Sequence, residues 1–320
     1  MKTKRLHGKR PQSFPFFCLP RFPIITSAQK DIALARTRCY PRGSMKYFTI
    51  LSTMILSASA FAQDKPAEKP AEPVKDTLGY QTTPMIPGSK WHVHDGLRPQ
   101  PRIVTPGEYS TQEKVGTAPS DAVVLFDGKD LSQWKSGDGE AKWKVENGYF
   151  ECVPKTGTLG TKGQWGPDVQ VHIEWMAPPP VGKGQGRGNS GLFFHGRYEI
   201  QVLDCFDNPT YPDGQATAIY GQTPPLVNAT RPPQTWNTYD VVFNGPRFDA
   251  EGKVLKPAYV TIFHNGVLTQ NHTELTGSTP HQQVGKYTKH GEKTDITLQD
   301  HGNTMRFRNV WIRELKPSGE

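Results

Sequence analysis

The sequence predicts an all-β fold in which two antiparallel sheets pack face to face in one domain. From Ala122 onward, short runs rich in Val, Ile, Phe, Tyr and Trp are separated by Gly, Pro, Asn and Asp, a texture typical of strands joined by turns. No apolar stripe with a helical period lies between these runs, and parallel strands would need crossover helices. About a dozen strands in roughly 200 residues suit a β-sandwich.

The expected strands are the apolar runs between these turn signals. In chain order they are Val123–Phe126, Trp143–Val145, Tyr149–Val153, Val169–Trp175, Gly191–His195, Tyr198–Asp204, Thr238–Phe243, Tyr259–His264, Val267–Asn271, Ile296–Leu298 and Met305–Leu315.

Two dipeptides predict tight hairpins. Asn265-Gly266 joins two apolar runs, and a type I′ turn favours this pair because both central residues need positive φ. Gly196-Arg197 is expected to form a second two-residue loop, which would pair Phe194 with Glu199. The loop length fixes the register of the whole hairpin.

Three polar side chains lie in the expected strand Tyr198–Asp204. In a regular strand Glu199 and Gln201 share one face, whereas Asp204 points to the other. A β-bulge near the end of the strand would bring Asp204 onto the face of Glu199, and bulges often re-aim side chains beside active sites. The alternative is a solvated sheet face.

The run that precedes this hairpin, GRGNSG, combines polar side chains with three glycines. Arg187 and Asn189 supply a cation and an amide at the end of the hairpin where Asp204 falls. Glycine lets a backbone approach a ligand closely, and an arginine suits an oxyanion. The run is therefore either part of a sugar site or an ordinary glycine-rich turn.

A second polar cluster lies in Leu298–Asn303 and contains Gln299, Asp300 and His301 next to a glycine. A histidine at such a turn can act as acid or base near neutral pH. A capped hairpin loop without catalytic function is the alternative.

Further polar and aromatic residues are candidates for the same surface. Arg306 and Arg308 share a strand face and need carboxylate partners, which Glu199, Asp204 or Glu174 can supply. The polar face of Val169–Trp175, which carries Glu174, meets either solvent or the concave surface. Tyr211, Tyr220 and Trp236 either stack on sugar rings or close the edge of the core.

The N-terminal region is expected to be removed from the working protein. Residues 1–44 hold ten Lys and Arg against one acid and predict no fold, so they are interpreted as an over-extended reading frame, with a genuine basic leader as the alternative. Residues 45–62 have the form of a signal peptide ending in Ala60-Phe61-Ala62. Its apolar run is too short for a permanent membrane span. We therefore expect an exported protein, periplasmic or extracellular.

Cleavage after Ala62 would change the formal net charge from +8 to −2, which removes the main argument for a nucleic-acid partner. Residues 63–118 are rich in Pro and are expected to form a linker and an irregular surface segment. The folded domain is expected at 119–316. Its two cysteines, Cys152 and Cys205, form either one disulfide or two buried thiols.

Six blocks of sequence, taken in order, resemble the 3-keto-disaccharide hydrolase family. They are PSDAVVLFDGKDLSQW, GRGNSGLFFHGRYEIQVLD, TYPDGQATAIYGQTPPLVN, WNTYDVVF, the hairpin around HNGV, and LQDHGNTMRFRNVWIREL. The resemblance covers about residues 119–316. Where such proteins often have Ser after the aspartate, this chain has Cys205.

The resemblance implies a concanavalin A-like jelly-roll fold and cleavage of glycosides whose C3 hydroxyl has been oxidised to a ketone. As a hypothesis for that reaction, Asp204 or Glu199 removes the C2 proton, Arg187 with Gln201 or Asn189 holds the enolate oxygen, and His301 assists the leaving oxygen. A divalent cation such as calcium is the alternative to the arginine. The residues expected to bind substrate are Gln201, Asn189, Glu174, Tyr211, Tyr220, Trp236, Gln299, Asp300, Arg306 and Arg308.

Two other functions stay open from the sequence. The same sandwich fold hosts carbohydrate-binding modules without catalytic activity. The spacing of Glu199, Gln201 and Asp204 also resembles the ExDxxE strand of retaining β-glucanases, although Gln replaces the central acid.

Overall fold

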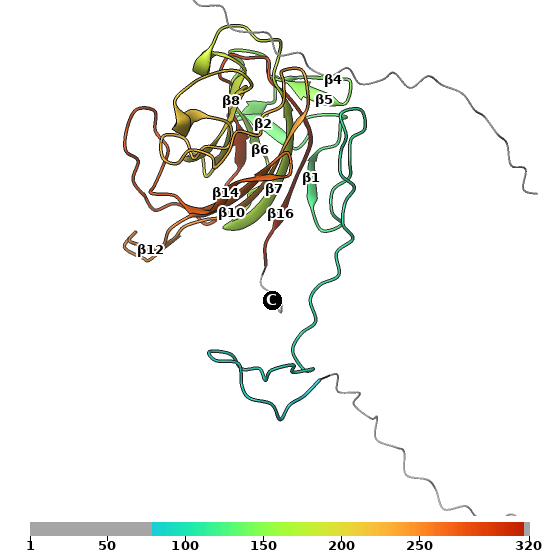
Figure 1. Ribbon diagram of the computed structural model, residues 1–320, viewed down its shortest axis with the longest axis vertical. Coiled ribbons are helices and arrows are strands. Elements are labelled where there is room, and N and C mark those ends of the chain that lie inside the picture. Colours follow the sequence, from blue (N-terminus) through green and yellow to red (C-terminus); the bar gives the residue numbers. More distant parts are fainter. Residues whose placement is uncertain (1–78, 317–320) are drawn as a thin grey trace, which may run out of the picture. The chain divides into compact units, whose positions relative to one another are not determined.

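The computed structural model describes residues 79–316, whose strands form two large antiparallel sheets (Figure 1). The eight-stranded sheet contains, in spatial order, β14 (Val267–Glu274), β13 (Tyr259–His264), β10 (Asn237–Asn244), β7 (Asp168–Met176), β16 (Arg306–Glu314), β5 (Tyr149–Glu151) and β4 (Lys144–Glu146), and β1 (Val123–Phe126) also pairs with β16. Figure 1 shows β10, β7 and β16 in one layer.

The six-stranded sheet forms the other layer. Its order is β3 (Gly139–Glu140), β2 (Trp134–Ser136), β6 (Leu159–Thr161), β15 (Ile296–Leu298), β8 (Asn189–Phe194) and β9 (Tyr198–Leu203). A separate ribbon pairs β11 (Arg247–Phe248) with β12 (Val254–Lys256), and the helical content of the described residues is two short 3₁₀ turns, η1 (Gly184–Gly186) and η2 (Pro212–Gly214). The all-β fold class predicted from the sequence is confirmed.

The core lies between the inner faces of the two sheets. On β10, buried and partly exposed residues alternate, which places Tyr239, Val241 and Phe243 inside. Phe194 of β8 stacks on Phe243 with ring centroids 4.3 Å apart, so this pair joins the two sheets directly. Burying an apolar side chain of this size stabilises the fold by about 1.5–3 kcal/mol.

Five short strands were not predicted from the sequence: β2, β3, β6, β11 and β12. Each contains two or three residues, which is too few for an alternating pattern to be recognised. β2 and β3, and likewise β11 and β12, pair as local hairpins, whereas β6 pairs with β2 and with β15, which are distant in the sequence.

One predicted hairpin is confirmed and the other is shifted by one residue. Asn265 and Gly266 have φ of 53° and 80°, as a type I′ turn requires. In the second hairpin Phe194 pairs with Tyr198, so the loop contains three residues and not two. The reason is His195, which itself adopts a positive φ of 55°.

The predicted bulge in the second hairpin is wrong, because β8 and β9 pair without a register shift. Glu199 and Gln201 therefore face outward, opposite Phe193 and Gly191. Asp204 lies one residue beyond β9, and its N–H donates to the carbonyl oxygen of Gly188. The two carboxylates of this stretch do not share a face.

A bulge does occur in β16, where the pairing with β7 shifts between Arg308 and Trp311. Asn309 has a positive φ of 46° at this point. The bulge reverses the expected alternation, so that Val310 enters the core and Trp311 faces outward.

Residues 79–118 contain no strand, apart from an isolated bridge between Met85 and His92. No helix in residues 79–316 is long and apolar enough to cross a membrane. The predicted N-terminal extension, signal peptide and residues 63–78 of the linker lie outside the described residues.

Candidate active site

A cavity of about 320 Å³ opens on the outer face of the six-stranded sheet. This volume is at the lower end of the roughly 300–1,000 Å³ that is usual for small-molecule sites. Side chains from β8, β9 and the loops around them line it: Gln185, Asn189, Phe193, Glu199, Gln201, Tyr211, Tyr220, Thr279, His281, Gln299 and His301.

Glu199 is the single Asp or Glu among these lining residues, and it is 5% exposed. Its carboxylate lies over Gly191 of the neighbouring strand, where a Cβ would come within 2.4 Å of Glu199 Oε1. None of the described residues donates a hydrogen bond to this carboxylate, and burial raises its pKa to about 8. A buried carboxyl group without a partner is poised to exchange a proton near neutral pH.

Amide groups surround Glu199 and are held in place by Gln185. Gln201 Nε2 donates to Gln185 Oε1 at 2.8 Å, and Asn189 Nδ2 donates to the Gln185 carbonyl oxygen at 2.8 Å. Gln299 is fixed through its backbone, because its N–H donates to the carbonyl oxygen of Gly191 at 2.9 Å. The side chain of Gln299 has no partner among the described residues. The cavity therefore offers preorganised amide dipoles.

Three side chains form a hydrogen-bonded chain along one wall. The hydroxyl groups of Tyr211 and Tyr220 are 2.9 Å apart, and the Tyr220 hydroxyl lies 2.7 Å from His281 Nδ1. Burial is the largest cause that raises the pKa of Tyr220, so this phenol stays protonated at neutral pH. These two hydrogen bonds fix the orientation of the imidazole ring of His281.

His301 enters the cavity from a turn that Asp300 stabilises. Asp300 Oδ1 accepts from the Gly302 N–H at 2.9 Å, and Oδ2 accepts from the Gly157 N–H at 3.1 Å. Asp300 therefore stabilises the turn and does not line the cavity. His301 does line the cavity, and its side chain is exposed.

Asp204 and Arg187 lie outside the cavity and bind each other. Arg187 Nε is 2.8 Å from Asp204 Oδ2, and Arg187 Nη2 donates to Asp204 Oδ1 at 3.0 Å and to the carbonyl oxygen of Phe206. Asp204 is 1% exposed. This pair joins the ends of β8 and β9, so the structure does not bring Asp204 and Arg187 together with Glu199.

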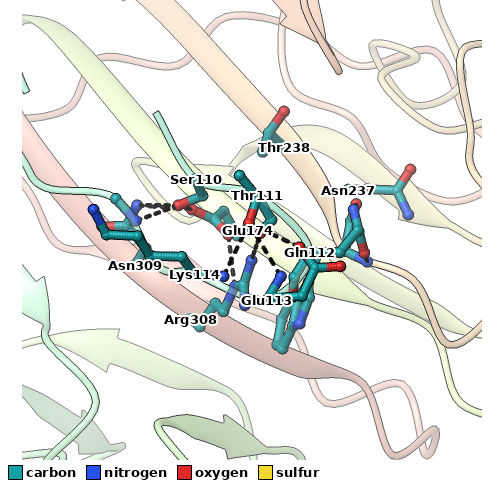
Figure 2. Close-up of polar contacts among 12 residues, drawn as sticks. Ser110, Thr111, Gln112, Glu113, Lys114, Glu174, Asn237, Thr238, Arg308 and Asn309 are labelled. Atoms are coloured by element: carbon teal, nitrogen blue, oxygen red, sulfur yellow. Dashed lines mark hydrogen bonds and ion pairs between the residues drawn. The ribbon is translucent and has the colours of Figure 1, made fainter. Parts of the chain in front are cut away.

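Four other candidates lie on the eight-stranded sheet or, for Trp236, directly before its strand β10. Glu174, fully buried, accepts from Arg308 Nε at 2.7 Å, from Asn309 Nδ2 at 2.7 Å and from the hydroxyl of Ser110 (Figure 2). The guanidinium of Arg308 also stacks on Trp236, at 4.3 Å from the ring centroid. At Glu174, the polar face of β7 therefore meets neither bulk solvent nor the Glu199 cavity.

Arg306, the last of the four, pairs with Glu151 at 2.5 Å. The hypothesis that the two arginines need carboxylate partners is correct. Arg308 pairs with Glu174, one of the three partners predicted, whereas Arg306 pairs with Glu151, which was not predicted. Residues 110–112 pack onto this sheet and help to hold Arg308 beside Glu174, because Arg308 Nη2 donates to the carbonyl oxygen of Thr111 (Figure 2).

The cavity also contains residues that sequence analysis did not select: Gln185, Phe193, Thr279 and His281. Phe193 alternates with core residues on β8, which is a signal that could have been used. Thr279 and His281 lie between β14 and β15 without a local pattern. Thr279 is placed by its bonds to the carbonyl oxygen of Arg197 and to the N–H of Glu199.

Two further observations concern metals and thiols. Within residues 79–316, no group of three or more His, Cys, Asp or Glu side chains is arranged to hold a metal ion.

Cys152 and Cys205 are both free and buried, so the two-thiol alternative applies. Burial raises the pKa of the Cys205 thiol to about 12, which makes it unreactive.

Comparison with known proteins identifies the class to which this fold and cavity belong. Residues 121–313 match the 3-keto-α-glucoside-1,2-lyase-like domain, so the chain belongs to that family and the resemblance drawn from the sequence is confirmed. A 3-keto-disaccharide hydrolase of Bacteroides thetaiotaomicron is 24% identical, over 60% of this chain and 78% of that protein.

Solved structures from Parabacteroides distasonis are also similar. One, assigned provisionally to the glycosyl hydrolases, is 44% identical with a TM-score of 0.66 and covers 72% of this chain and 100% of its own. A second with the same assignment is 20% identical, with a TM-score of 0.46, over 61% of this chain and 94% of its own.

Proposed function

We propose that this chain cleaves the glycosidic bond of 3-keto-glycosides, including 3-keto-disaccharides, by elimination followed by hydration. Membership of the lyase-like family and similarity to a 3-keto-disaccharide hydrolase support the substrate class. The observation that carries the reaction type is the isolated, buried carboxyl group of Glu199 in the cavity.

The number of carboxylates separates this reaction from that of an ordinary glycosidase. Conventional glycoside hydrolysis uses two carboxyl groups, about 5–10 Å apart, on either side of the bond. Glu199 is the single Asp or Glu that lines the cavity, and Asp204 is bound to Arg187. One base together with neutral hydrogen-bond donors suits proton abstraction next to a ketone.

The C3 ketone makes the required chemistry available. It acidifies the proton on C2, which ionised Glu199 removes, and the electron pair of the C2–H bond moves into an enolate whose charge lies on O3. The enolate then re-forms the ketone and a C1–C2 double bond as the C1–O bond breaks. Water subsequently adds across this double bond, with its hydroxyl on C1 and its proton on C2, which gives net hydrolysis.

Other cavity residues supply the remaining roles in this proposal. The amides of Gln201 and Gln299 donate to the enolate oxygen in place of Arg187. In this proposal the Tyr220 hydroxyl, 2.7 Å from His281 Nδ1, donates a hydrogen bond to that nitrogen, so that the neutral imidazole carries its proton on Nε2. His301 donates a proton to the leaving oxygen, and Tyr211, which is 42% exposed, packs against the sugar ring.

The test uses 3-keto-trehalose and unoxidised trehalose in D₂O. The proposal predicts release of glucose from the ketone alone, with one deuterium at C2 of the 3-keto-glucose product, measured by NMR at early times. Cleavage without deuterium at C2 would contradict elimination and favour direct hydrolysis. Cleavage of both sugars would indicate a conventional glucanase, and binding without release would indicate a carbohydrate-binding module.

We also propose that the reaction takes place outside the cytoplasm, on the basis of the signal-peptide pattern in residues 45–62. N-terminal sequencing of protein produced in a bacterial host tests this. A mature chain that begins at Gln63 in the exported fraction is expected, and an uncleaved cytoplasmic chain would contradict the proposal.

A further inference from the structure

A second and larger cavity, of about 490 Å³, lies on the outer face of the eight-stranded sheet. Because the core separates the two sheets, this cavity opens on the opposite side of the sandwich from Glu199. Residues 105–119, called the strap here, form one wall of it, and outward-facing residues of β7, β10, β13 and β16 form the floor. The proposed reaction uses none of these residues.

The strap is held firmly against the sheet (Figure 2). Gln112 exchanges two hydrogen bonds with the backbone of Trp236, at 2.9 and 2.7 Å, and Ser110 donates to Glu174. Within the strap, the Thr117 N–H donates to the carbonyl oxygen of Glu108 at 3.0 Å. These bonds hold the backbone on both sides of Tyr109.

Two aromatic side chains are exposed to solvent at this cavity. Tyr109 is 94% exposed although its neighbours in the strap are bonded, and Phe263 of β13 is 41% exposed. Trp311 lies in the floor and stacks on His172, with centroids 5.1 Å apart and planes 5° apart. Exposed aromatic rings on a fixed backbone offer flat apolar faces at a low entropy cost.

Among the described residues, the polar groups without a partner in this cavity include two donors, Gln170 Nε2 and Trp311 Nε1, and two acceptors, which belong to Asn309 and Asp240. Asn309, 9% exposed, is aimed outward by the β16 bulge, and its Nδ2 donates to Glu174. Its Oδ1 has no partner among the described residues. Asp240 Oδ1 lies 2.7 Å from His172 Nδ1, whereas its Oδ2 has no partner within the described part of the chain.

The charges in this cavity favour a neutral ligand. His172 is buried, which lowers its pKa, but its contacts with Asp240 and Glu174 outweigh burial and raise the pKa to about 9. The resulting imidazolium balances Asp240, and Glu108 pairs with Lys114 at 2.9 Å, so each carboxylate that lines the cavity has a cationic partner. A purely apolar ligand would leave the Asn309 and Asp240 oxygens unpaired.

From this arrangement we propose that the strap cavity is a second binding site, for a neutral oligosaccharide, separate from the Glu199 cavity. Sugar hydroxyls donate to Asn309 Oδ1 and Asp240 Oδ2, and the C–H face of a sugar ring packs on Tyr109. The cavity volume lies within the usual range for small-molecule sites. Such a site would hold a glycan chain while the opposite face acts on an oxidised unit.

The test measures binding of maltohexaose, cellohexaose and laminarihexaose to the full chain by calorimetry. At least one is expected to bind, with affinity lowered tenfold or more in both Tyr109→Ala and Asp240→Asn. Tyr80→Ala, which removes an exposed tyrosine outside the cavity, and Glu199→Gln should bind as the unchanged protein does.

Thermal unfolding of each variant controls for folding, and loss of Tyr109 should leave the midpoint unchanged because the side chain is exposed. Two results would overturn the proposal. One is that no hexasaccharide binds at millimolar concentration. The other is that Glu199→Gln abolishes binding while Tyr109→Ala preserves it, which would place the sugar in the first cavity.

Discussion

Two buried glutamates on opposite sheets of this sandwich have opposite environments. Glu174 on β7 is fully buried, and Glu199 on β9 is 5% exposed. The Glu174 carboxylate accepts hydrogen bonds from Arg308, Asn309 and Ser110, and its Oε1 lies 3.4 Å from Nε2 of His172. None of the described residues bonds the Glu199 carboxylate.

The difference appears in the pKa of each group. Burial raises the pKa of both, but at Glu174 the hydrogen bonds from His172, Ser110 and Asn309 and the charge of Arg308 outweigh it, and the pKa is lowered. At Glu199 burial acts alone and raises the pKa to about 8. A buried carboxyl with partners holds structure together, whereas one without partners costs stability and is available for chemistry.

The largest expected effect is the loss of catalysis in Glu199→Gln. The amide keeps the size of the side chain but cannot accept the C2 proton, so kcat/KM for 3-keto-trehalose should fall by about 10²- to 10⁴-fold. Steady-state kinetics measures this. Glu151→Gln, in which the lost carboxylate pairs with Arg306 on the other sheet, should retain nearly full activity. Equal activities of the two variants would remove Glu199 from the reaction.

Next in size is the loss of stability in Glu174→Gln. The guanidinium of Arg308, with a side chain only 6% exposed, would then be buried without a counter-ion, so the free energy of unfolding should drop by about 3–5 kcal/mol. Urea unfolding at pH 7 measures it. The partly exposed pair of Glu151 and Arg306 should contribute only about 0–1 kcal/mol, and a similar cost for Glu151→Gln and Glu174→Gln would contradict the comparison.

The pH dependence of stability should differ between wild type and Glu199→Gln. The folded protein keeps the Glu199 proton up to about pH 8, whereas the unfolded chain releases it near pH 4.5. Folding therefore becomes less favourable as pH rises through this window, by at most about 4–5 kcal/mol at pH 8 and above. Chemical unfolding from pH 4 to 9 should show Glu199→Gln gaining stability relative to wild type. A constant difference across this range would disprove the raised pKa.

The smallest expected effect concerns Gly191→Ala. A methyl group there would lie 2.4 Å from Glu199 Oε1 and 2.8 Å from Phe193 Cε2, so it would displace the carboxylate and the edge of the phenyl ring, which are both ends of side chains. We expect kcat to fall by about 10- to 100-fold with little change in the unfolding midpoint. Gly186→Ala, at a position with open space around the added methyl, is the matched control. Unchanged kcat in Gly191→Ala would mean that the position of the carboxylate is not critical.

The fold could be predicted from sequence where the pattern is local and regular. β10 alternates over eight residues, and Asn265-Gly266 gives a turn whose geometry the residue types require. The second hairpin was misplaced by one residue because a histidine, and not a glycine or asparagine, enters the left-handed region at its start. The bulge at Asn309 depends on its contacts with Glu174 and Ser110, which no local pattern announces.

The cavity could be predicted only in part for the same reason. Glu199, Gln201, Asn189, Gln299 and His301 lie in short polar motifs beside strands, and the structure brings them together. Glu174, Arg308 and Trp236 are instead covered by the strap, whose Ser110 lies 64 residues before Glu174 in the chain. His281 reaches the cavity from a long loop and is oriented by Tyr220. Such long-range placements follow from tertiary packing and cannot be read from sequence patterns.

The most direct test is an NMR titration of the Glu199 carboxyl carbon in the free protein, assigned by its disappearance in Glu199→Gln. We expect a midpoint near pH 8, well above the usual value for glutamate. A midpoint at or below pH 4.5 would mean that the carboxylate has partners or solvent, and that the cavity is not built around an isolated base.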